Sequence, residues 1–314
     1  VKKNGRQSGL QRYLCLACKM SFQSTTKTRQ KVLQSKYDWN QYVFHRHTVK
    51  ELAEKNELGE RQIRRRLGRQ AAVQPSDYIF NNLIEDKTVP VVLLIDTTYF
   101  DCFGVMVFRC YNRRRNLMWR FVEHESNEGY LDGIVELEKH GYVILAVVCD
   151  GKRWLLGLLS KKYPSQLCQF HMVKTVTRYI TRYPVLPAGK ELLWIALALK
   201  NSTEVEFKDK LMKWFFKWQN FLNEKTIDDY ETNKWHYTHD RMRSAYAALI
   251  SNIRYLFTYQ KFPSYGIPNT TNSIDGTFSQ VKQKVHVHRG LATNKQMAMI
   301  SDLLRGEIAT RNVH

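Results

Sequence analysis

The chain has 314 residues, enough for one large domain or two to three small ones, and its hydrophobic content of 43% can build a core. No apolar run approaches the roughly 18 residues that a membrane span needs, and we find no secretory signal, so we expect neither a membrane partner nor export. The net charge of +20 favours a polyanionic partner, with nucleic acid as the default.

The positive charge is concentrated near the N-terminus. Residues 1–70 hold 17 Lys and Arg against five Asp and Glu, a net charge of +12, which leaves +8 for the other 244 residues. We expect a DNA-docking arm in front of a catalytic body. The six cysteines are typical of a reduced, cytoplasmic chain, because the pair nearest the N-terminus has the spacing of metal ligands rather than of a disulfide.

Residues 1–30 are expected to form part of a zinc ribbon. Cys15 and Cys18 supply two thiolates, which is half of a tetrahedral zinc site, and no second pair lies nearby. Because the chain begins with Val1 rather than Met, we expect the missing pair to lie upstream, and Zn²⁺ to bind only if it exists. A chance pair or a redox pair is the alternative.

Residues 31–75 have the pattern of a helix-turn-helix DNA-binding domain. Thr48 and Glu51 form a capping box, and a second short apolar helix face follows a turn near residues 56–59. The alternative is a solvated basic helix in an unrelated bundle. The second helix carries the arginines that we expect at phosphates or base edges, namely Arg61, Arg64, Arg65 and Arg66.

Two apolar runs in the body end on a carboxylate. Residues 91–95 precede Asp96, and residues 143–149 precede Asp150. Short continuous apolar runs indicate strands buried on both faces, and ligands of open α/β sheets bind beyond the carboxyl ends of such strands. Alternatively, each Asp starts a turn or caps a helix. The repeated pattern favours two carboxylates at one place.

The order of elements in residues 76–185 predicts the fold of this part. Three strands in a meander, a helix, a strand, a helix, a strand and a helix follow one another. This is an α/β, ribonuclease H-like arrangement: a mixed five-stranded sheet with helices on both faces. We assign these residues to the first part of a catalytic core.

Residues 186–265 are expected to form an all-helical insertion. Thr203 and Glu206 form a capping box, and the stripe that follows runs at helical spacing from Val205 through Trp214 to Leu222. The aromatic side chains of this stripe suit helix packing better than a stacking platform for bases.

Residues 266–314 are predicted to complete the core. A polar lead-in precedes a helix whose buried stripe includes Ile274 and Phe278, whereas Asn272, Asp275 and Lys282 share another face. Asp275 lies in the first turn, where it stabilises the helix dipole in any case. As a third acid, it would meet Asp96 and Asp150. Clustered carboxylates call for a cation, and such sets hold Mg²⁺ or Mn²⁺ for phosphodiester chemistry.

The sequence resembles bacterial insertion-sequence transposases of the Mutator-like group, within the DDE superfamily. The motifs that carry the resemblance are residues 94–98, 148–151, 168–171, 269–276 and 288–291. The resemblance implies Asp96 and Asp150 as the first two acids, and Asp275 at a third position where such enzymes usually have Glu. It also implies transposition of a mobile element with recombination of double-stranded DNA, at transposon ends and target, by a homo-oligomer near the nucleoid.

Four further residues have expected roles. Cys168 and His171 match a Cys-x-x-His element of this group whose role is uncertain, and they equally suit a packed strand end and a helix start. His288 and Arg289 follow the third-acid helix, and we expect them at phosphate, with a plain basic loop as the alternative. The runner-up hypothesis for the whole chain is a catalytically inactive or truncated DNA-binding relative, and a ribonuclease H-type nuclease is a weaker one.

Overall fold

The computed structural model describes residues 1–7, 10–23, 26–68, 78–81, 89–152, 154–229, 234–288 and 290–306. The chain divides into two compact units. The first comprises Val1–Gln74 and Val281–Gly306, and the second comprises Pro75–Gln280 with Glu307–His314. Within the described ranges, no helix is both long enough and apolar enough to cross a membrane.

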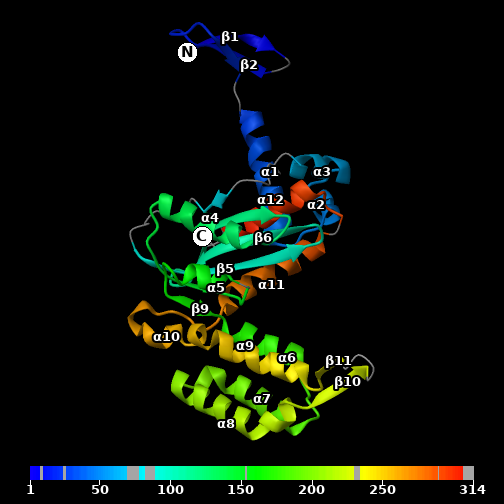
Figure 1. Ribbon diagram of the computed structural model, residues 1–314. Coiled ribbons are helices and arrows are strands. Elements are labelled where there is room, and N and C mark those ends of the chain that lie inside the picture. Colours follow the sequence, from blue (N-terminus) through cyan, green and yellow to red (C-terminus); the bar gives the residue numbers. More distant parts are fainter. Residues whose placement is uncertain are drawn as a thin grey trace. The chain divides into compact units, whose positions relative to one another are not determined.

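A six-stranded mixed sheet organises the second unit (Figure 1). Its strand order is β4-β7-β6-β5-β8-β9. The antiparallel meander predicted from the sequence is β5 (Val91–Phe100), β6 (Phe103–Cys110) and β7 (Arg115–Val122), and the parallel strands are β8 (Ile144–Cys149) and β9 (Ser165–Leu167). The α/β class is confirmed. The expected count of five strands is corrected to six, because the short β4 (Ile79–Phe80) pairs with β7.

Strand β5 is buried on both faces, as its apolar run predicted. Leu93 and Ile95 belong to the large core cluster, which also holds Ile134 of α4 (Asn127–Lys139). Val92 and Leu94 belong to a second cluster, with residues of β8 and Ile267. Alternate residues therefore face opposite sides of the sheet.

Helix α4 packs tightly on the sheet at Gly133. A Cβ at this position would lie 2.0 Å from the ring of Phe108, so only glycine fits there. The chain then passes through α5 (Leu155–Leu159) between β8 and β9, and α6 (Gln169–Ile180) follows β9. These short connections keep the carboxyl ends of the parallel strands next to one another.

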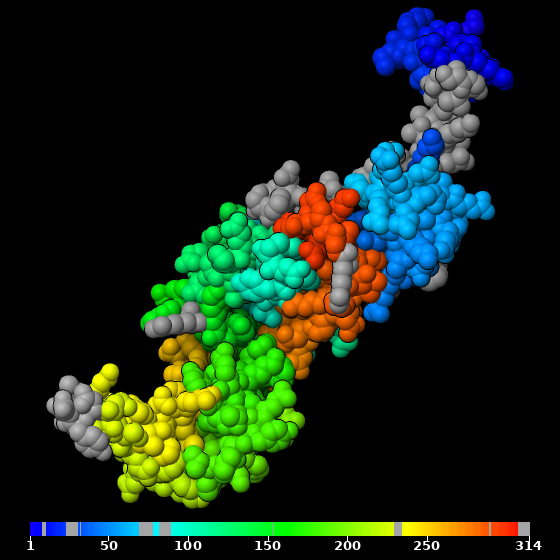
Figure 2. Space-filling model, turned by 90° about the vertical axis from the view of Figure 1, so that its right-hand side faces the viewer, coloured from blue at the N-terminus to red at the C-terminus, as the bar shows by residue number. Residues whose placement is uncertain are grey.

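A helical region follows, shown in green to yellow in Figure 2. Helices α6 and α9 pack side by side, and α7 and α8 pack against them (Figure 1). The elements are α7 (Pro187–Leu197), η1 (Ala198–Asn201), α8 (Glu204–Leu222), α9 (Asp240–Leu256), α10 (Thr258–Lys261) and η2 (Pro263–Tyr265). The capping box of Thr203 and Glu206 is present.

Two expectations for the helical region are corrected. The region is not all helical, because β10 (Lys225–Asp229) and β11 (Lys234–Tyr237) form an antiparallel hairpin in which Ile227 pairs with Trp235. Such β-branched and aromatic residues favour strands. Val205 is 77% exposed and does not join the buried stripe, which holds Phe207 and Trp214 instead. Trp214 stacks on Tyr246, so the aromatic side chains serve helix packing.

The first unit contains a three-stranded antiparallel sheet, β1 (Lys2–Gln7), β2 (Leu10–Leu14) and β3 (Ser21–Gln23). Its helices are α1 (Thr26–Phe44), α2 (Val49–Lys55), α3 (Glu60–Gly68), α12 (Thr293–Arg305) and the end of α11 (Asn272–Val287). The boundary expected at residue 30 falls inside α1. Residues 281–306 pack with this unit rather than with the core, partly because Trp39 donates a 2.6 Å hydrogen bond to Asp302.

The predicted pair of short helices is present in the first unit. Thr48 and Glu51 form the expected capping box at the start of α2. Residues 56–59 connect α2 to α3, and Glu57 has a positive φ of 52° in this tight turn. Leu52 of α2 and Ile63 of α3 are fully buried.

Candidate functional site

Strand register brings Asp96 and Asp150 to neighbouring positions. Ile95 of β5 pairs in parallel with Cys149 of β8, so the two acids are the next residues along adjacent strands. Neighbouring strands lie about 4.8 Å apart. Asp96 is 8% exposed, and its carboxylate accepts a 2.8 Å hydrogen bond from the backbone N–H of Thr97. The two acids therefore occupy the same end of the parallel part of the sheet.

A third acid, Asp275, lies near enough to act on Asp96. Burial, followed by repulsion from Asp150 and Asp275, raises the pKa of Asp96 to about 7. Burial is also the main cause that raises the pKa of Asp150. Charged groups shift the pKa of a neighbour this far only over short distances in a site with little water. The structure thus places Asp150 and Asp275 close enough to Asp96 for their charges to act on its carboxylate.

The segment before α11 is tied to the end of β9. The backbone N–H of Gln169 donates to the carbonyl of Asn269 at 2.9 Å, and the side-chain amide of Asn269 donates to Oε1 of Gln169 at 3.1 Å. Thr271 is fully buried, and its N–H and hydroxyl lie 3.3 and 3.2 Å from the sulfur of Cys168. Asp275 follows within one turn, so these bonds position the third acid.

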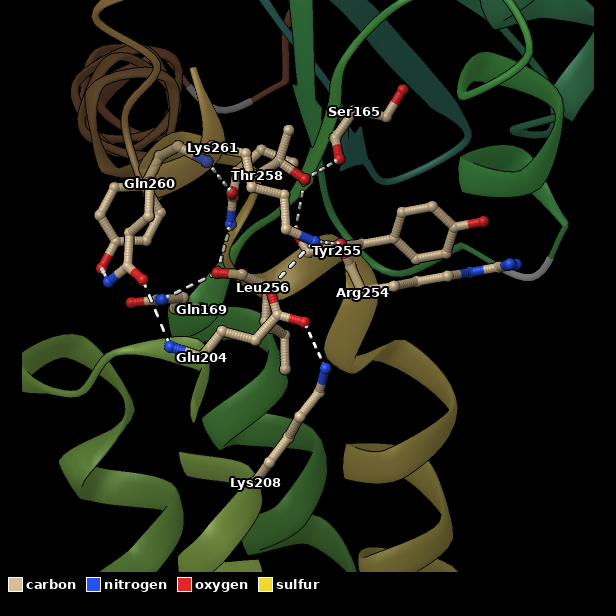
Figure 3. A network of polar contacts seen from close by, with 12 residues as sticks. Ser165, Gln169, Glu204, Lys208, Arg254, Tyr255, Leu256, Thr258, Gln260 and Lys261 are labelled. Carbon is tan, nitrogen blue, oxygen red and sulfur yellow. Dashed lines mark hydrogen bonds and ion pairs between the residues drawn. The ribbon is translucent and has the colours of Figure 1, made fainter. Parts of the chain in front are cut away.

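The start of α6 is anchored in turn to the end of α9 (Figure 3). The side-chain amides of Gln166 and Gln169 both donate to the carbonyl of Leu256, at 3.0 and 2.9 Å. The hydroxyl of Thr258 donates to the carbonyl of Ser165 at 2.7 Å. These bonds satisfy the free carbonyls at a helix end, and they join the helical region to the strand that carries Cys168.

Cys168 and His171 form a polar pair beside the acids. Burial alone would raise the pKa of the Cys168 thiol, but hydrogen bonds from His171 and Thr271 outweigh it and lower that pKa. The hydrogen bond to Cys168 raises the pKa of His171, and the charges of Asp275 and Asp96 add to this effect. The thiol and the carboxylates around His171 therefore favour its protonated form.

A fourth carboxylate at this edge was not predicted. Glu125 contributes to the raised pKa of Asp150. The hydroxyl of Tyr130 donates to Glu125 at 2.7 Å, and the ammonium of Lys152 lies 3.4 Å from Glu125 and donates to its backbone carbonyl at 2.6 Å. Glu125 follows no apolar run that ends on it, so the sequence offered no signal that would separate it from its acidic neighbours.

Carboxylate oxygens are the ligands that Mg²⁺ and Mn²⁺ prefer. Burial without a counter-ion disfavours the charged form of Asp96, and this is the situation that a bound cation relieves. However, the described part of the chain contains no set of three or more His, Cys, Asp or Glu side chains arranged to hold a metal ion. The donor chemistry suits a divalent cation, whereas the acids alone do not enclose one.

Cys15 and Cys18 lie in the turn between β2 and β3. The N–H of Cys15 donates to Met20 and the N–H of Lys19 donates back to Cys15, both at 2.9 Å. Hydrogen bonds from Cys18 lower the pKa of the Cys15 thiol. A lowered thiol pKa suits a metal ligand, but two thiolates supply only half of a zinc site.

The arginines of α3 differ in what they contact. Arg61 and Arg65 are exposed, and Arg64 forms a 3.0 Å ion pair with exposed Glu60. Arg66 instead forms a 2.9 Å ion pair with Asp38, a residue of α1 that is fully buried. DNA binding by Arg66 stays a prediction, and the structure adds that its guanidinium neutralises an internal carboxylate.

The residues after α11 also differ from expectation. His288 is 6% exposed and its ring lies 3.8 Å from that of Tyr42, so it packs inside the first unit and does not face phosphate. Burial lowers the pKa of His288, which favours the neutral ring. Lys282 and Asn272 are exposed. Arg289 lies outside the described residues.

The sequence was also compared with known proteins. No protein-family model matches the chain. A search of curated proteins finds no match either. The functional conclusion therefore depends on the geometry and electrostatics described above.

Proposed function

We propose that this chain is a DNA transposase of the DDE type with a ribonuclease H-like core. The observation that carries the proposal is the convergence of acids at one sheet edge. Asp96 and Asp150 follow paired residues of adjacent parallel strands, and both Asp150 and Asp275 raise the pKa of Asp96. Buried like charges cost stability and are typical of functional sites.

In this proposal, Asp96, Asp150 and Asp275 hold Mg²⁺ or Mn²⁺. Because the protein side chains alone do not enclose an ion, we infer that oxygens of a bound phosphodiester complete the ligand set. When bound, divalent ions supply activation of the attacking oxygen and stabilisation of the leaving oxygen. The shorter Asp275, compared with the usual Glu, also leaves room for such external ligands.

The residues around the acids have complementary roles. Cys168 and the neighbouring carboxylates favour the protonated form of His171, which would present positive charge to a phosphate bound at the acids. We propose that water first breaks a phosphodiester bond at a transposon end, which leaves a 3′-hydroxyl. That hydroxyl then attacks a phosphate of the target DNA and releases another 3′-hydroxyl. His171 acts in both steps by orienting the phosphate.

The first unit is proposed to bind the terminal inverted repeats in double-stranded DNA. Its support is the net charge of +12 over residues 1–70 and the exposure of Arg61, Arg64 and Arg65. Phosphate contacts by such side chains provide most of the non-specific affinity for DNA. A homo-oligomer assembled on DNA, in the cytoplasm near the nucleoid, is part of the same proposal.

Strand cleavage in vitro tests the proposal. We expect Asp96→Asn and Asp150→Asn to reduce Mg²⁺-dependent cleavage of DNA that carries the flanking inverted repeats by more than about a hundredfold, with DNA binding retained. Asp101→Asn is the matched control, because Asp101 is an exposed acid in the turn after β5. Cleavage that survives both core substitutions would exclude this active site.

The second candidate is a catalytically inactive DNA-binding relative. It is favoured by Asp275 at the third position and by the lack of an enclosed metal site among the described residues. The same assay separates the two candidates. Retained DNA binding with no cleavage in either Mg²⁺ or Mn²⁺ would support the inactive relative.

A further inference from the structure

A basic hollow lies in the second unit, away from the three acids. It has a volume of about 430 Å³ and is lined by residues 160–165, which connect α5 to β9, and by side chains between Arg254 and Phe262. This volume falls within the range of about 300–1,000 Å³ that is common for ligand sites. The hollow therefore lies where the end of α9 meets the start of β9.

Four cationic side chains line the hollow, and two of them pair with carboxylates that lie outside its lining. Lys162 pairs with Glu138 at 2.6 Å and Lys261 pairs with Glu204 at 2.9 Å. Lys161 and Arg254 form no ion pair with any residue that the structure describes, although Arg254 stacks on the ring of Tyr255. The hollow thus keeps a net positive charge of about two for a ligand.

The floor of the hollow is fixed before any ligand arrives. Thr258 and Ser165 are buried, and the hydroxyl of Thr258 donates to the carbonyl of Ser165 (Figure 3). Figure 3 also shows the side chains of Arg254 and Tyr255 extending to the same side from the end of α9. A rigid floor beneath cationic side chains reduces the entropy lost when an anion binds.

The position of the hollow suits a nucleic-acid strand. The edge strand β9 begins at Ser165, which lines the hollow, and ends at Leu167. The next residue, Cys168, contacts Thr271 beside the acids. Three strand residues span about 10 Å, which equals roughly three nucleotides at 3.4 Å each. The hollow at the amino end of β9 and the acids at the carboxyl ends of the parallel strands are therefore separated along β9 by a length that a few nucleotides of DNA backbone span.

We propose that the basic hollow binds a backbone phosphate of the DNA strand that the acidic site acts on. The inference rests on the proposed function for the identity of the strand. Lys161 and Arg254 supply the uncompensated charge, and Lys162 and Lys261 supply further donors when their carboxylates release them. The hollow thus gives the second unit a DNA contact of its own, which does not depend on the base sequence because it binds phosphate.

The double variant Lys161→Glu/Arg254→Glu of the full chain tests the hollow. Each lost phosphate contact lowers the slope of log affinity against log salt by about 0.9. We expect a slope smaller by about 2 and a dissociation constant for duplex DNA raised at least about tenfold at 0.1 M salt. The matched control is Lys190→Glu/Lys200→Glu, which reverses two exposed cations elsewhere on the same unit. Thermal melts confirm folding, and Gln replaces Glu if the reversals unfold the chain.

Equal affinities and salt slopes for the two double variants would overturn the proposal. Protection of Lys161 from acetylation separates two sources of phosphate. We expect duplex DNA to protect it, and inorganic phosphate at equal ionic strength to protect it much less. Protection by inorganic phosphate alone would instead indicate a free-phosphate site. The catalytic proposal is tested separately. Asp96→Asn leaves the hollow intact and is judged by DNA cleavage, whereas the variants of the hollow are judged by DNA binding.

Discussion

The acidic edge of the sheet and the basic helix α3 use charge in opposite ways. At the edge, burial raises the pKa of Asp96, and repulsion from Asp150 and Asp275 adds to this shift. In α3, Arg64 and Arg66 each have a carboxylate partner. The first arrangement costs stability. The second contributes to stability or is neutral.

The difference shows how charge marks function in this molecule. A charged residue that the fold already neutralises, such as Arg66, has little left for a ligand. A charged residue that the fold leaves uncompensated, such as Asp96, is available for one. The number of arginines in α3 therefore exceeds the number of its arginines without a buried partner. At the sheet edge, Glu125 adds an acid that the motifs did not include.

The largest effect is expected at Asp96. Its ordinary pKa of 3.8 rises to about 7 in the folded chain, a difference that corresponds to about 4 kcal/mol. Because the folded state binds the proton more tightly, the group favours folding below pH 3.8, and this contribution is lost as the pH rises toward 7. We expect Asp96→Asn to raise the free energy of unfolding at pH 8 by up to about 4 kcal/mol, and by little at pH 4.

Urea denaturation of the wild type and of Asp96→Asn between pH 4 and pH 8, with a metal chelator present, measures the effect. Added Mg²⁺ should reduce the difference in free energy of unfolding between the two proteins at pH 8, because it stabilises the wild type. A stability difference that does not change with pH would show that Asp96 is not destabilised by its neighbours.

The next largest effect is expected in the first unit. Asp38→Ala removes the buried partner of Arg66, and also an acceptor for the side-chain amide of Gln34 at 3.0 Å. Removing one member of a buried ion pair costs about 3–5 kcal/mol. Because Arg66 is partly exposed, we expect a loss in free energy of unfolding of about 3 kcal/mol. Urea denaturation measures it, with Glu54→Ala on α2 as an exposed control. A loss no larger than that of the control would contradict the buried network.

Local patterns in the sequence predicted local structure well. The apolar runs before Asp96 and Asp150 became β5 and β8, and both Thr–Glu capping boxes are present. These features depend on residues within a few positions of one another. The register that places Asp96 beside Asp150 comes from the structure, because continuous apolar runs lack the alternation that would fix it from the sequence.

Features that depend on distant partners were not predictable. Arg66 meets Asp38, which lies 28 residues away, and His288 packs on Tyr42 across most of the chain. Glu125 faces Asp150 only because β7 and β8 end at the same edge. No local pattern reports such contacts, so the sequence identified the acids of the motifs but not their neighbours.

DNA-binding measurements on variants of Arg61 and Arg66 test whether an exposed arginine and an internally paired arginine have different roles. We expect Arg61→Ala to weaken binding of duplex DNA about fivefold and to lower the salt slope by about 0.9, because it removes one exposed phosphate contact. Stability should stay within about 0.5 kcal/mol of wild type. Arg66→Ala should do the reverse, losing stability with little change in salt slope. Fluorescence anisotropy at several salt concentrations and urea denaturation separate the two outcomes.

The smallest effect is expected for the exposed pair of Arg64 and Glu60. Their 3.0 Å contact has the same chemistry as the pair of Arg66 and Asp38, but both side chains are largely in solvent. Solvent screening and side-chain entropy leave such pairs worth below about 0.5 kcal/mol. Glu60→Ala should therefore leave the urea midpoint almost unchanged, and it should tighten DNA binding slightly because Arg64 is released. A loss approaching that of Asp38→Ala would mean that burial does not decide which charges stabilise the unit.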